Sequence, residues 1–291
     1  MKISNKEEYI TKCNICSNQN LTELLEYQKF YLQKCKNCNF IFSNKIPNIE
    51  MINECYSGYD RSVVLSDNSI KNIEKIISRQ IKKYSIDTIL DIGCGNGEFL
   101  EIYKKFEKET YFTEFGEDLI YKLKQKHKFI EGGMNPITEK KFDLVILSEV
   151  IEHTNDPTSL IKSISNLQNQ GGLIYITTPN YNSLEHTILK KDYGIFSYPE
   201  HLSYFTIASL DILLRKNGYK KIYGYSSNFS LYRFLEYFNK RKITKINIHK
   251  SSDKIQVMSK KTGLIYLKNM ISIILKLLNM GNTLYFFYIK K

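Results

Sequence analysis

Residues 88–97 read Thr-Ile-Leu-Asp-Ile-Gly-Cys-Gly-Asn-Gly, and this stretch decides the fold. Its first half is short, apolar and rich in β-branched residues, which is typical of a buried strand. Its second half has glycine at 93, 95 and 97, where the absence of a Cβ lets the backbone turn tightly and approach a ligand. A helical stretch, 98–108, follows. The sequence therefore predicts a strand, a glycine turn and a helix, with the turn serving either as a plain turn or as a nucleotide-type site.

The same alternation continues along the chain. Strand-like runs alternate with stretches of helical periodicity, and helix-like residues 69–84 precede the glycine turn. The later strands are expected at 109–115, 142–147, 173–177, 219–225 and 283–289, and the later helices at 117–126, 157–167 and 207–216. Repeated β-α units indicate a doubly wound, mostly parallel α/β sheet.

One acidic residue supports the nucleotide interpretation. Glu114 lies 23 positions after Asp91, where the next strand is expected to end. A carboxylate there can accept both hydroxyl protons of a ribose. A solvated acid at a strand end is the alternative.

Four of the six cysteines lie in the first 38 residues, as two Cys-x2-Cys pairs eighteen residues apart. Two such pairs supply four thiolates to one tetrahedral zinc ion, and the binding free energy holds together a segment too small for its own core. All four ligands are then cysteines, so the zinc is structural. The alternative is four buried or oxidised cysteines. The predicted zinc ligands are Cys13, Cys16, Cys35 and Cys38.

The positive charge is concentrated near the C-terminus. Residues 240–291 hold twelve Lys or Arg and one acid, so they carry +11 of the net +12, while the first 239 residues are almost neutral. This pattern argues against a nucleic-acid-binding surface over the bulk of the protein. A basic amphipathic helix within 240–280 would rest on an anionic membrane or attract an anionic acceptor. A core-packing helix with a solvated lysine face is the alternative.

The first residues have no apolar signal-peptide core, which predicts a cytoplasmic protein, with contact at the inner membrane only through residues 240–280. No stretch there is long and uncharged enough to span a bilayer.

Several spaced motifs resemble those of the class I S-adenosylmethionine-dependent methyltransferases. Leu90–Gly97 resembles the first motif of that family, Phe142–His153 followed by Asp156-Pro157 the fourth-strand motif, and Gly171–Asn180 the fifth-strand motif. The resemblance implies a Rossmann-like, doubly wound, mostly parallel seven-stranded sheet preceded by a small zinc-ribbon-like module. The expected division is a zinc module with its connector at 1–60 and a methyltransferase domain at 61–291, with a basic helical insertion at about 228–281.

The same resemblance implies S-adenosylmethionine as cofactor and assigns residues to it. The three glycines surround its methionine part, Glu114 binds the ribose, and Ser148 lies beside the sulfonium. Met134 packs on the adenine, in place of the acidic residue that the family often has after its third strand. The expected cofactor-binding residues are Asp91, Gly93, Gly95, Gly97, Glu114, Met134 and Ser148.

Two polar segments are expected to carry the chemistry. Glu149-x2-Glu152-His153 resembles the Glu-x-x-Glu-His of ubiquinone-pathway O-methyltransferases, where these side chains can hold a second divalent metal in addition to the structural zinc. The alternative is that they cap the next helix. The segment around His201 resembles a loop that covers the acceptor pocket in the same group, which makes His201 the preferred general base and His153 a second one.

A four-cysteine module before this core resembles bacterial methyltransferases that act on deoxysugars and surface glycans. This combination implies O-methylation of a sugar nucleotide or glycan intermediate in polysaccharide biosynthesis. The alternatives are a small-molecule, quinol-type O-methyltransferase, an RNA-binding methyltransferase and a non-catalytic member of the fold.

Overall fold

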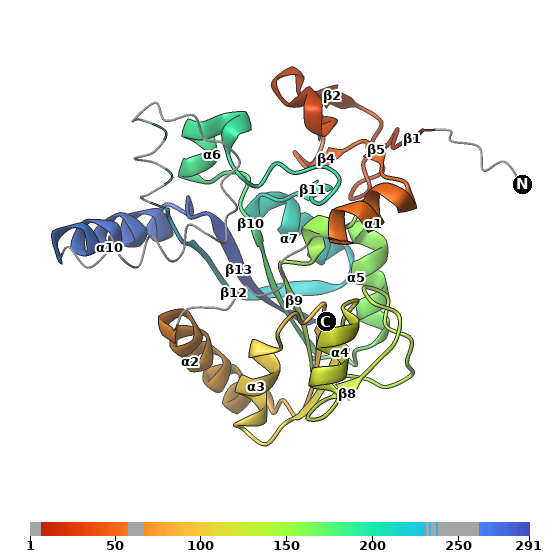
Figure 1. The fold of residues 1–291 in the computed structure, drawn as a ribbon, viewed down its shortest axis with the longest axis vertical. Coiled ribbons are helices and arrows are strands. Elements are labelled where there is room, and N and C mark those ends of the chain that lie inside the picture. Colours follow the sequence, from red (N-terminus) through yellow and green to blue (C-terminus); the bar gives the residue numbers. More distant parts are fainter. Residues whose placement is uncertain (1–6, 58–66, 231–232, 234–236, 238–261) are drawn as a thin grey trace, which may run out of the picture.

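The computed structural model describes residues 7–57, 67–230, 233, 237 and 262–291 (Figure 1). The expected domain boundary near residue 60 and residues 238–261 of the expected insertion lie outside the described residues.

A seven-stranded sheet forms the centre of the described chain, with the strand order β12-β13-β10-β9-β6-β7-β8. β9 pairs in parallel with β6 and β10, and β7 pairs in parallel with β6 and β8, whereas β13 runs antiparallel between β10 and β12. The doubly wound, mostly parallel sheet is therefore confirmed. The strands are β6 (Thr88–Ile92), β7 (Glu109–Thr113), β8 (Lys128–Phe129), β9 (Leu144–Ser148), β10 (Leu173–Pro179), β12 (Tyr219–Ser227) and β13 (Thr283–Lys290).

The helices that follow the strands are close to those expected, except that α3 and α4 end three or four residues early. Beyond α3, Glu107 has a positive φ of 57°, so the chain leaves the helix in a turn before β7. The helices are α2 (Asp67–Tyr84), α3 (Glu98–Lys104), α4 (Glu117–Leu123), α5 (Pro157–Asn166), α6 (Leu184–Leu189), α7 (Ile207–Lys216) and α10 (Thr262–Leu277).

Helices cover both faces of the sheet because the buried strand β9 is apolar on both sides. Leu144 and Ile146 pack in the cluster that contains side chains of α2 and α3. Val145 and Leu147 point the other way and pack in the cluster that contains side chains of α5 and α7. This double burial explains why the strand reads as a continuous apolar run. Within β9 the only polar side chain is that of Ser148, at the carboxyl end of the strand.

The N-terminal residues form short strands around the cysteines, and one strand of the main domain joins them. β11 (Ser203–Tyr204) pairs antiparallel with β4, giving the sheet order β11-β4-β3-β2. Figure 1 shows this region beside β11. Its elements are β1 (Glu8–Tyr9), β2 (Leu21–Glu23), a 3-10 helix at Leu25–Phe30, β3 (Leu32–Cys35), β4 (Ile41–Ser43), β5 (Lys45–Ile46) and α1 (Ile49–Ser57).

None of the helices in the described ranges is both long and apolar enough to cross a membrane.

Candidate functional site

The glycine turn lies at the carboxyl end of β6 and is fastened to the end of β7. The Gly93 N–H donates to the Thr113 carbonyl at 3.0 Å, and the Gly95 N–H donates to Glu114 Oε2 at 2.9 Å. Gly95 has a φ of +54°, and a Cβ built there would meet no atom within 4 Å. The backbone at Gly95 therefore borders open space, as a ligand-binding turn requires.

Glu114 stands where the sequence places it, directly after β7 and beside the turn. Its Oε1 accepts hydrogen bonds from the backbone N–H groups of Phe115 at 2.8 Å and Gly116 at 3.1 Å. Together with the Gly95 bond, these contacts fix the orientation of the carboxylate. A fixed carboxylate next to a glycine turn is suited to binding a pair of ribose hydroxyls.

Asp91, the residue before the last one of β6, has a carboxyl group that is buried and has no hydrogen-bond partner within the described structure. Its side chain is 1% exposed, and neither carboxylate oxygen has a hydrogen-bond partner within the described structure. Burial, with the charges of Glu98 and Glu114, raises the pKa of Asp91 well above its usual range. A buried carboxyl that lacks partners favours a ligand that brings a positive charge. The ammonium group of S-adenosylmethionine is such a charge, so the residues present fit this cofactor.

Directly after Glu114 stands an aromatic residue, Phe115, that the sequence patterns did not single out. Phe115 is 64% exposed, and its ring lies where a Cβ at Gly133 would come within 2.3 Å of the ring atom Cζ. Met134, the residue expected at the adenine, is half-buried against the main core. A large aromatic residue directly after the strand-end acid was the available signal. Phe115 is better exposed than Met134 for stacking on a base.

The end of β9 brings Ser148 and Glu149 to the same edge of the sheet. Ser148 Oγ lies 3.1 Å from Thr177 Oγ1 on β10, and the Glu149 N–H donates to the Thr177 carbonyl at 3.0 Å. Glu149 has a φ of +54°, which turns the chain sharply out of the strand. Its side chain is reached by solvent, yet the surrounding protein desolvates the carboxyl and raises its pKa. Glu149 is therefore a solvent-accessible carboxyl whose charged form the surrounding protein disfavours.

Glu152 is the buried member of the pair. Its side chain is 2% exposed, and its Oε2 accepts a hydrogen bond from Thr178 Oγ1 at 3.0 Å. Desolvation, followed by repulsion from the Glu149 carboxylate, raises the pKa of Glu152 well above its usual range. The raised pKa of each carboxyl favours its protonated form, because the buried pair disfavours two negative charges.

His153 and His201 meet beside Glu152, and both rings are oriented by the backbone. His153 Nδ1 lies 2.8 Å from the Glu200 carbonyl, and His201 Nδ1 lies 2.7 Å from the Ile195 carbonyl. A carbonyl oxygen only accepts, so each Nδ1 carries the proton, and the neutral His201 ring has its lone pair on Nε2. Burial lowers the pKa of each histidine to about 4, with the neighbouring His201 contributing at His153.

These residues also make a possible metal site. One ligand atom from each of Glu152, His153 and His201 lies within 4.8 Å of the others. A carboxylate with two imidazoles is a donor set suited to a divalent transition metal. The sequence hypothesis assigned Glu149, Glu152 and His153 to such a metal. Among the described residues, the cluster found in the structure contains Glu152 and His153 but not Glu149, and its third member is His201, from a loop 48 positions after His153.

The four N-terminal cysteines converge as predicted. Cys13 and Cys38 have their sulfurs 3.5 Å apart, as do Cys16 and Cys35, and all four sulfurs lie within 4.8 Å of one another. Sulfurs around one zinc ion at the usual bond length of about 2.3 Å are about 3.8 Å apart in a tetrahedron. The cluster therefore fits one zinc ion with four thiolate ligands.

Two matched turns produce this convergence. The Ser17 N–H donates to the Cys13 carbonyl at 2.7 Å, and the Asn39 N–H donates to the Cys35 carbonyl at 2.9 Å. Ser17 and Asn39 both have a positive φ, near 60°. Each Cys-x2-Cys segment therefore folds into the same tight turn, with both sulfurs on one side, as in a zinc ribbon.

The cysteine region supports the loop that carries His201. The Ser43 N–H donates to the Leu202 carbonyl at 2.8 Å, and the Leu202 N–H donates to the Glu152 carbonyl at 2.8 Å. Phe40 packs on Phe205 with ring centroids 5.3 Å apart. The backbone therefore links the four-cysteine region to the histidine cluster through β4 and the residues just before β11.

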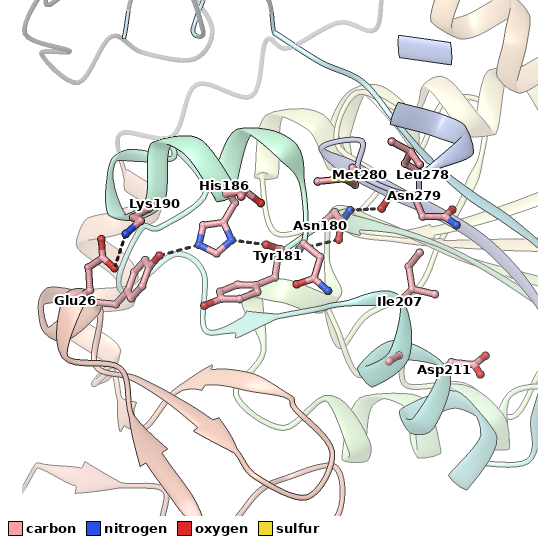
Figure 2. A pocket seen from close by; sticks show the side chains of 14 residues that line it. Glu26, Asn180, Tyr181, His186, Lys190, Ile207, Asp211, Leu278, Asn279 and Met280 are labelled. Atoms are coloured by element: carbon pink, nitrogen blue, oxygen red, sulfur yellow. Dashed lines mark hydrogen bonds and ion pairs between the residues drawn. The ribbon is translucent and has the colours of Figure 1, made fainter. Parts of the chain in front are cut away.

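A cavity of 810 Å³ lies elsewhere, between the N-terminal region, helices α6 and α7 and the turn that follows α10 (Figure 2). Its wall includes an ion pair between Lys190 and Glu26 at 3.9 Å, and Tyr27 and His186 joined by a hydrogen bond of 2.8 Å. Leu278 and Met280 line another part of it. No residue of the Glu152–His153–His201 cluster takes part in this wall.

Comparisons with known proteins agree with this architecture. An uncharacterized protein from Methanocaldococcus jannaschii is 29% identical over 164 residues, which are 54% of this chain and 72% of that protein. A ubiquinone biosynthesis O-methyltransferase from Caulobacter vibrioides is 31% identical over 108 residues, which are 32% of this chain and 41% of that enzyme. The matched part thus spans less than half of the Caulobacter enzyme.

Among solved structures, a SAM-dependent methyltransferase from Archaeoglobus fulgidus has the same fold. It aligns with a TM-score of 0.51 and 20% identity over 84% of this chain and all of that one. A magnesium protoporphyrin IX methyltransferase from Synechocystis PCC 6803 aligns with a TM-score of 0.52 and 12% identity, over 84% of this chain and 99% of that one.

A family model described as a methyltransferase domain matches residues 61–223. This range contains the glycine turn, Glu114, His153 and His201, and it is more than half of the chain. The chain belongs to the methyltransferase domain family.

Proposed function

We propose that the protein transfers the methyl group of S-adenosylmethionine to a hydroxyl group of a sugar, carried by a sugar nucleotide or a surface-glycan intermediate. The observation that carries this proposal is the cluster of buried Glu152 with half-buried His153 and His201, which follows the carboxyl end of β9. It combines two histidines whose rings are oriented by backbone carbonyls with carboxyls whose pKa values are raised.

In this proposal, the residues around the glycine turn bind the cofactor. When bound, the cofactor supplies a methyl group on a positively charged sulfur, which is already activated for transfer. Asp91 binds its ammonium group, Glu114 binds the ribose hydroxyls, and Phe115 with Met134 packs on the adenine. The backbone at Gly95 lets the ligand approach, since no atom lies within 4 Å of the missing Cβ.

In this proposal, His201 or His153 removes the proton from the acceptor hydroxyl. The Nδ1–carbonyl bond leaves the His201 Nε2 lone pair as an acceptor for a hydroxyl proton. His153 is oriented in the same way and is the second candidate base. Glu149 and Glu152, whose pKa values are raised, can hydrogen-bond other hydroxyls of the acceptor both as donors and as acceptors. Alignment of the oxygen with the methyl group supplies the rest of the rate enhancement.

The sugar class rests on the resemblance of the whole arrangement, a four-cysteine module before a methyltransferase core, to bacterial sugar and glycan methyltransferases. The polar lining of the cluster is compatible with a ligand that has several hydroxyls. The +11 charge of residues 240–291 favours an anionic acceptor, such as a diphosphate sugar.

A quinol-type O-methyltransferase is the second candidate. It is favoured by the ubiquinone biosynthesis O-methyltransferases among the relatives, such as the one from Caulobacter vibrioides. The two candidates differ in the acceptor and not in the site. A requirement for a divalent metal in addition to zinc would favour the second one, because the cluster would then orient and acidify a phenolic hydroxyl.

The test is methyl transfer from isotopically labelled S-adenosylmethionine to a panel of sugar nucleotides and to catechol-type phenols, read by mass spectrometry. His201→Gln is expected to lower kcat by about a hundredfold or more, the usual loss for a general base. The matched control is His127→Gln, because His127 is also buried and hydrogen-bonded, to Thr110 Oγ1 at 2.7 Å, but lies away from the cluster. Transfer to phenols alone would replace the sugar proposal with the quinol one.

A further inference from the structure

Helix α10 carries a row of large apolar side chains in contact with solvent. Met270, Ile273, Ile274 and Leu277 on the helix, and Leu278 directly after its last residue, are 58%, 61%, 51%, 78% and 61% exposed, and we call them the apolar stripe. Their spacing of three, four, seven and eight residues places them on one side of the helix. Leu275, on another side, is 4% exposed. The helix is thus anchored through one face and presents a second apolar face to solvent.

An exposed apolar face of this kind indicates a binding partner. Single exposed apolar residues are ordinary, whereas a contiguous row marks a surface that another apolar phase covers. Figure 1 shows α10 at the periphery of the molecule, next to the edge of the sheet formed by β12 and β13. The stripe is therefore accessible to a large, flat partner.

Charge identifies the kind of partner. The described residues 262–291, which include the stripe, hold four lysines and no acid. On the helix itself, Lys276 lies beside the stripe with its Nζ 4.1 Å from the centre of the Tyr225 ring. Apolar side chains in a segment that has lysines and no acid complement an anionic lipid surface, which offers both an apolar interior and negative headgroups.

We propose that the apolar stripe of α10 docks on the surface of an anionic lipid bilayer, with the helix lying in the plane of the interface. The helix has 16 residues and does not meet the requirements for a membrane span. Leu278 also lines the 810 Å³ cavity, so docking brings that cavity next to the lipid. The inference does not depend on the identity of the acceptor.

The chain has no tryptophan, so a single introduced tryptophan reports on the stripe without background. The full-length Leu277→Trp variant is expected to shift its emission to shorter wavelength when vesicles containing phosphatidylglycerol are added. Vesicles of phosphatidylcholine alone are expected to give little shift. Tyr121→Trp is the control, because Tyr121 is 76% exposed on α4, away from the stripe, and its emission should not change.

Sedimentation with the same vesicles measures the affinity. The Ile273→Gln/Leu277→Gln variant is expected to lower the partition coefficient by about tenfold or more, since it removes two apolar side chains from the buried area. The control variant Ile49→Gln/Tyr121→Gln removes comparable exposed apolar residues elsewhere, 67% and 76% exposed, and should bind as the wild type does. Added salt should weaken the binding of the wild type.

Three results would overturn the proposal. They are an unshifted Leu277→Trp emission with anionic vesicles, equal binding by the stripe variant and the wild type, or a dimer in sedimentation velocity that the stripe variant abolishes. The last would assign the stripe to a second copy of the chain. Vesicle binding and methyl transfer are separate readouts, so failure of either proposal leaves the other testable.

Discussion

The imidazole rings of His153 and His201 meet nearly edge to face, with their centroids 4.9 Å apart and their planes at 74°. Each ring donates its Nδ1 proton to a carbonyl of the loop before β11. Protonation of either ring is unfavourable, because burial disfavours the imidazolium and two protonated rings would repel each other.

This relationship predicts an unusual pH profile. The pKa of each histidine is lowered to about 4, so the neutral, proton-accepting form exists above that value and is lost as the pH falls through it. We expect kcat for the methyl transfer to be flat from about pH 5 to 8, with no step near the ordinary histidine pKa of about 6.5. Stopped assays across this range check it, with circular dichroism confirming the fold at each pH. A fall in kcat centred near pH 6.5 would contradict the assignment.

The raised pKa of Asp91 predicts that its substitution raises the stability of the protein and lowers its affinity for S-adenosylmethionine. Its pKa is raised in the folded state, so the ionised form is disfavoured there and the protein loses stability as the pH rises above the unfolded pKa of about 4. Asp91→Asn is expected to raise Tm, by about 2–4 °C for each kcal/mol gained, and the gain should grow from pH 5.5 to pH 8. The same variant should bind S-adenosylmethionine about tenfold or more weakly.

Calorimetry and thermal melts at both pH values measure the two effects. A variant that is destabilised at pH 8, or that binds the cofactor as the wild type does, would show that Asp91 has another role.

Glu114→Ala tests the cofactor site directly. The carboxylate accepts three backbone N–H bonds that position it beside Gly95. Removal of its two bonds to the ribose, each about 1.5–3 kcal/mol, should raise Kd by about a hundredfold or more. The matched control is Glu117→Ala, in the first turn of α4, where the side chain is exposed. Isothermal titration of both variants should separate them clearly, and equal affinities would refute the ribose role.

Zinc removal should affect catalysis and not only the N-terminal region. Plasma emission spectrometry is expected to find one zinc ion per chain, bound by the four cysteines. Cys35→Ser should lower the zinc content and Tm, and it should lower kcat because β4 supports the loop of His201 through Leu202. Cys55→Ser is the control, since Cys55 lies outside the cluster. Full activity in zinc-depleted protein would show that the module is dispensable for the site.

The main sheet was predictable because its signals are local. The apolar run before Gly93 specifies a buried strand, and the glycines specify the turn. Glu114 was predictable for the same reason, since strand ends in a parallel sheet meet at one edge. The cysteines were predictable from their spacing, which the two matched turns explain.

What could not be predicted depends on contacts between distant parts of the chain. β4 and β11 pair through two residues each, and they are separated by about 160 positions, so neither has a recognisable strand pattern. His153 and His201 were each singled out, but their contact depends on the loop that β11 holds in place. The lack of partners around Asp91 also became visible only once the surrounding side chains were positioned.

The pairing of β11 with β4 has a consequence for how this gene could be shortened or recombined. A truncated chain that starts at the methyltransferase domain would leave Ser203 and Tyr204 as an unpaired edge and would remove the Phe40 ring from Phe205. The N-terminal module therefore does not behave as a cassette that can be exchanged freely. Homologues that lack the four cysteines yet retain the His201 loop should possess another segment that fills the place of β4.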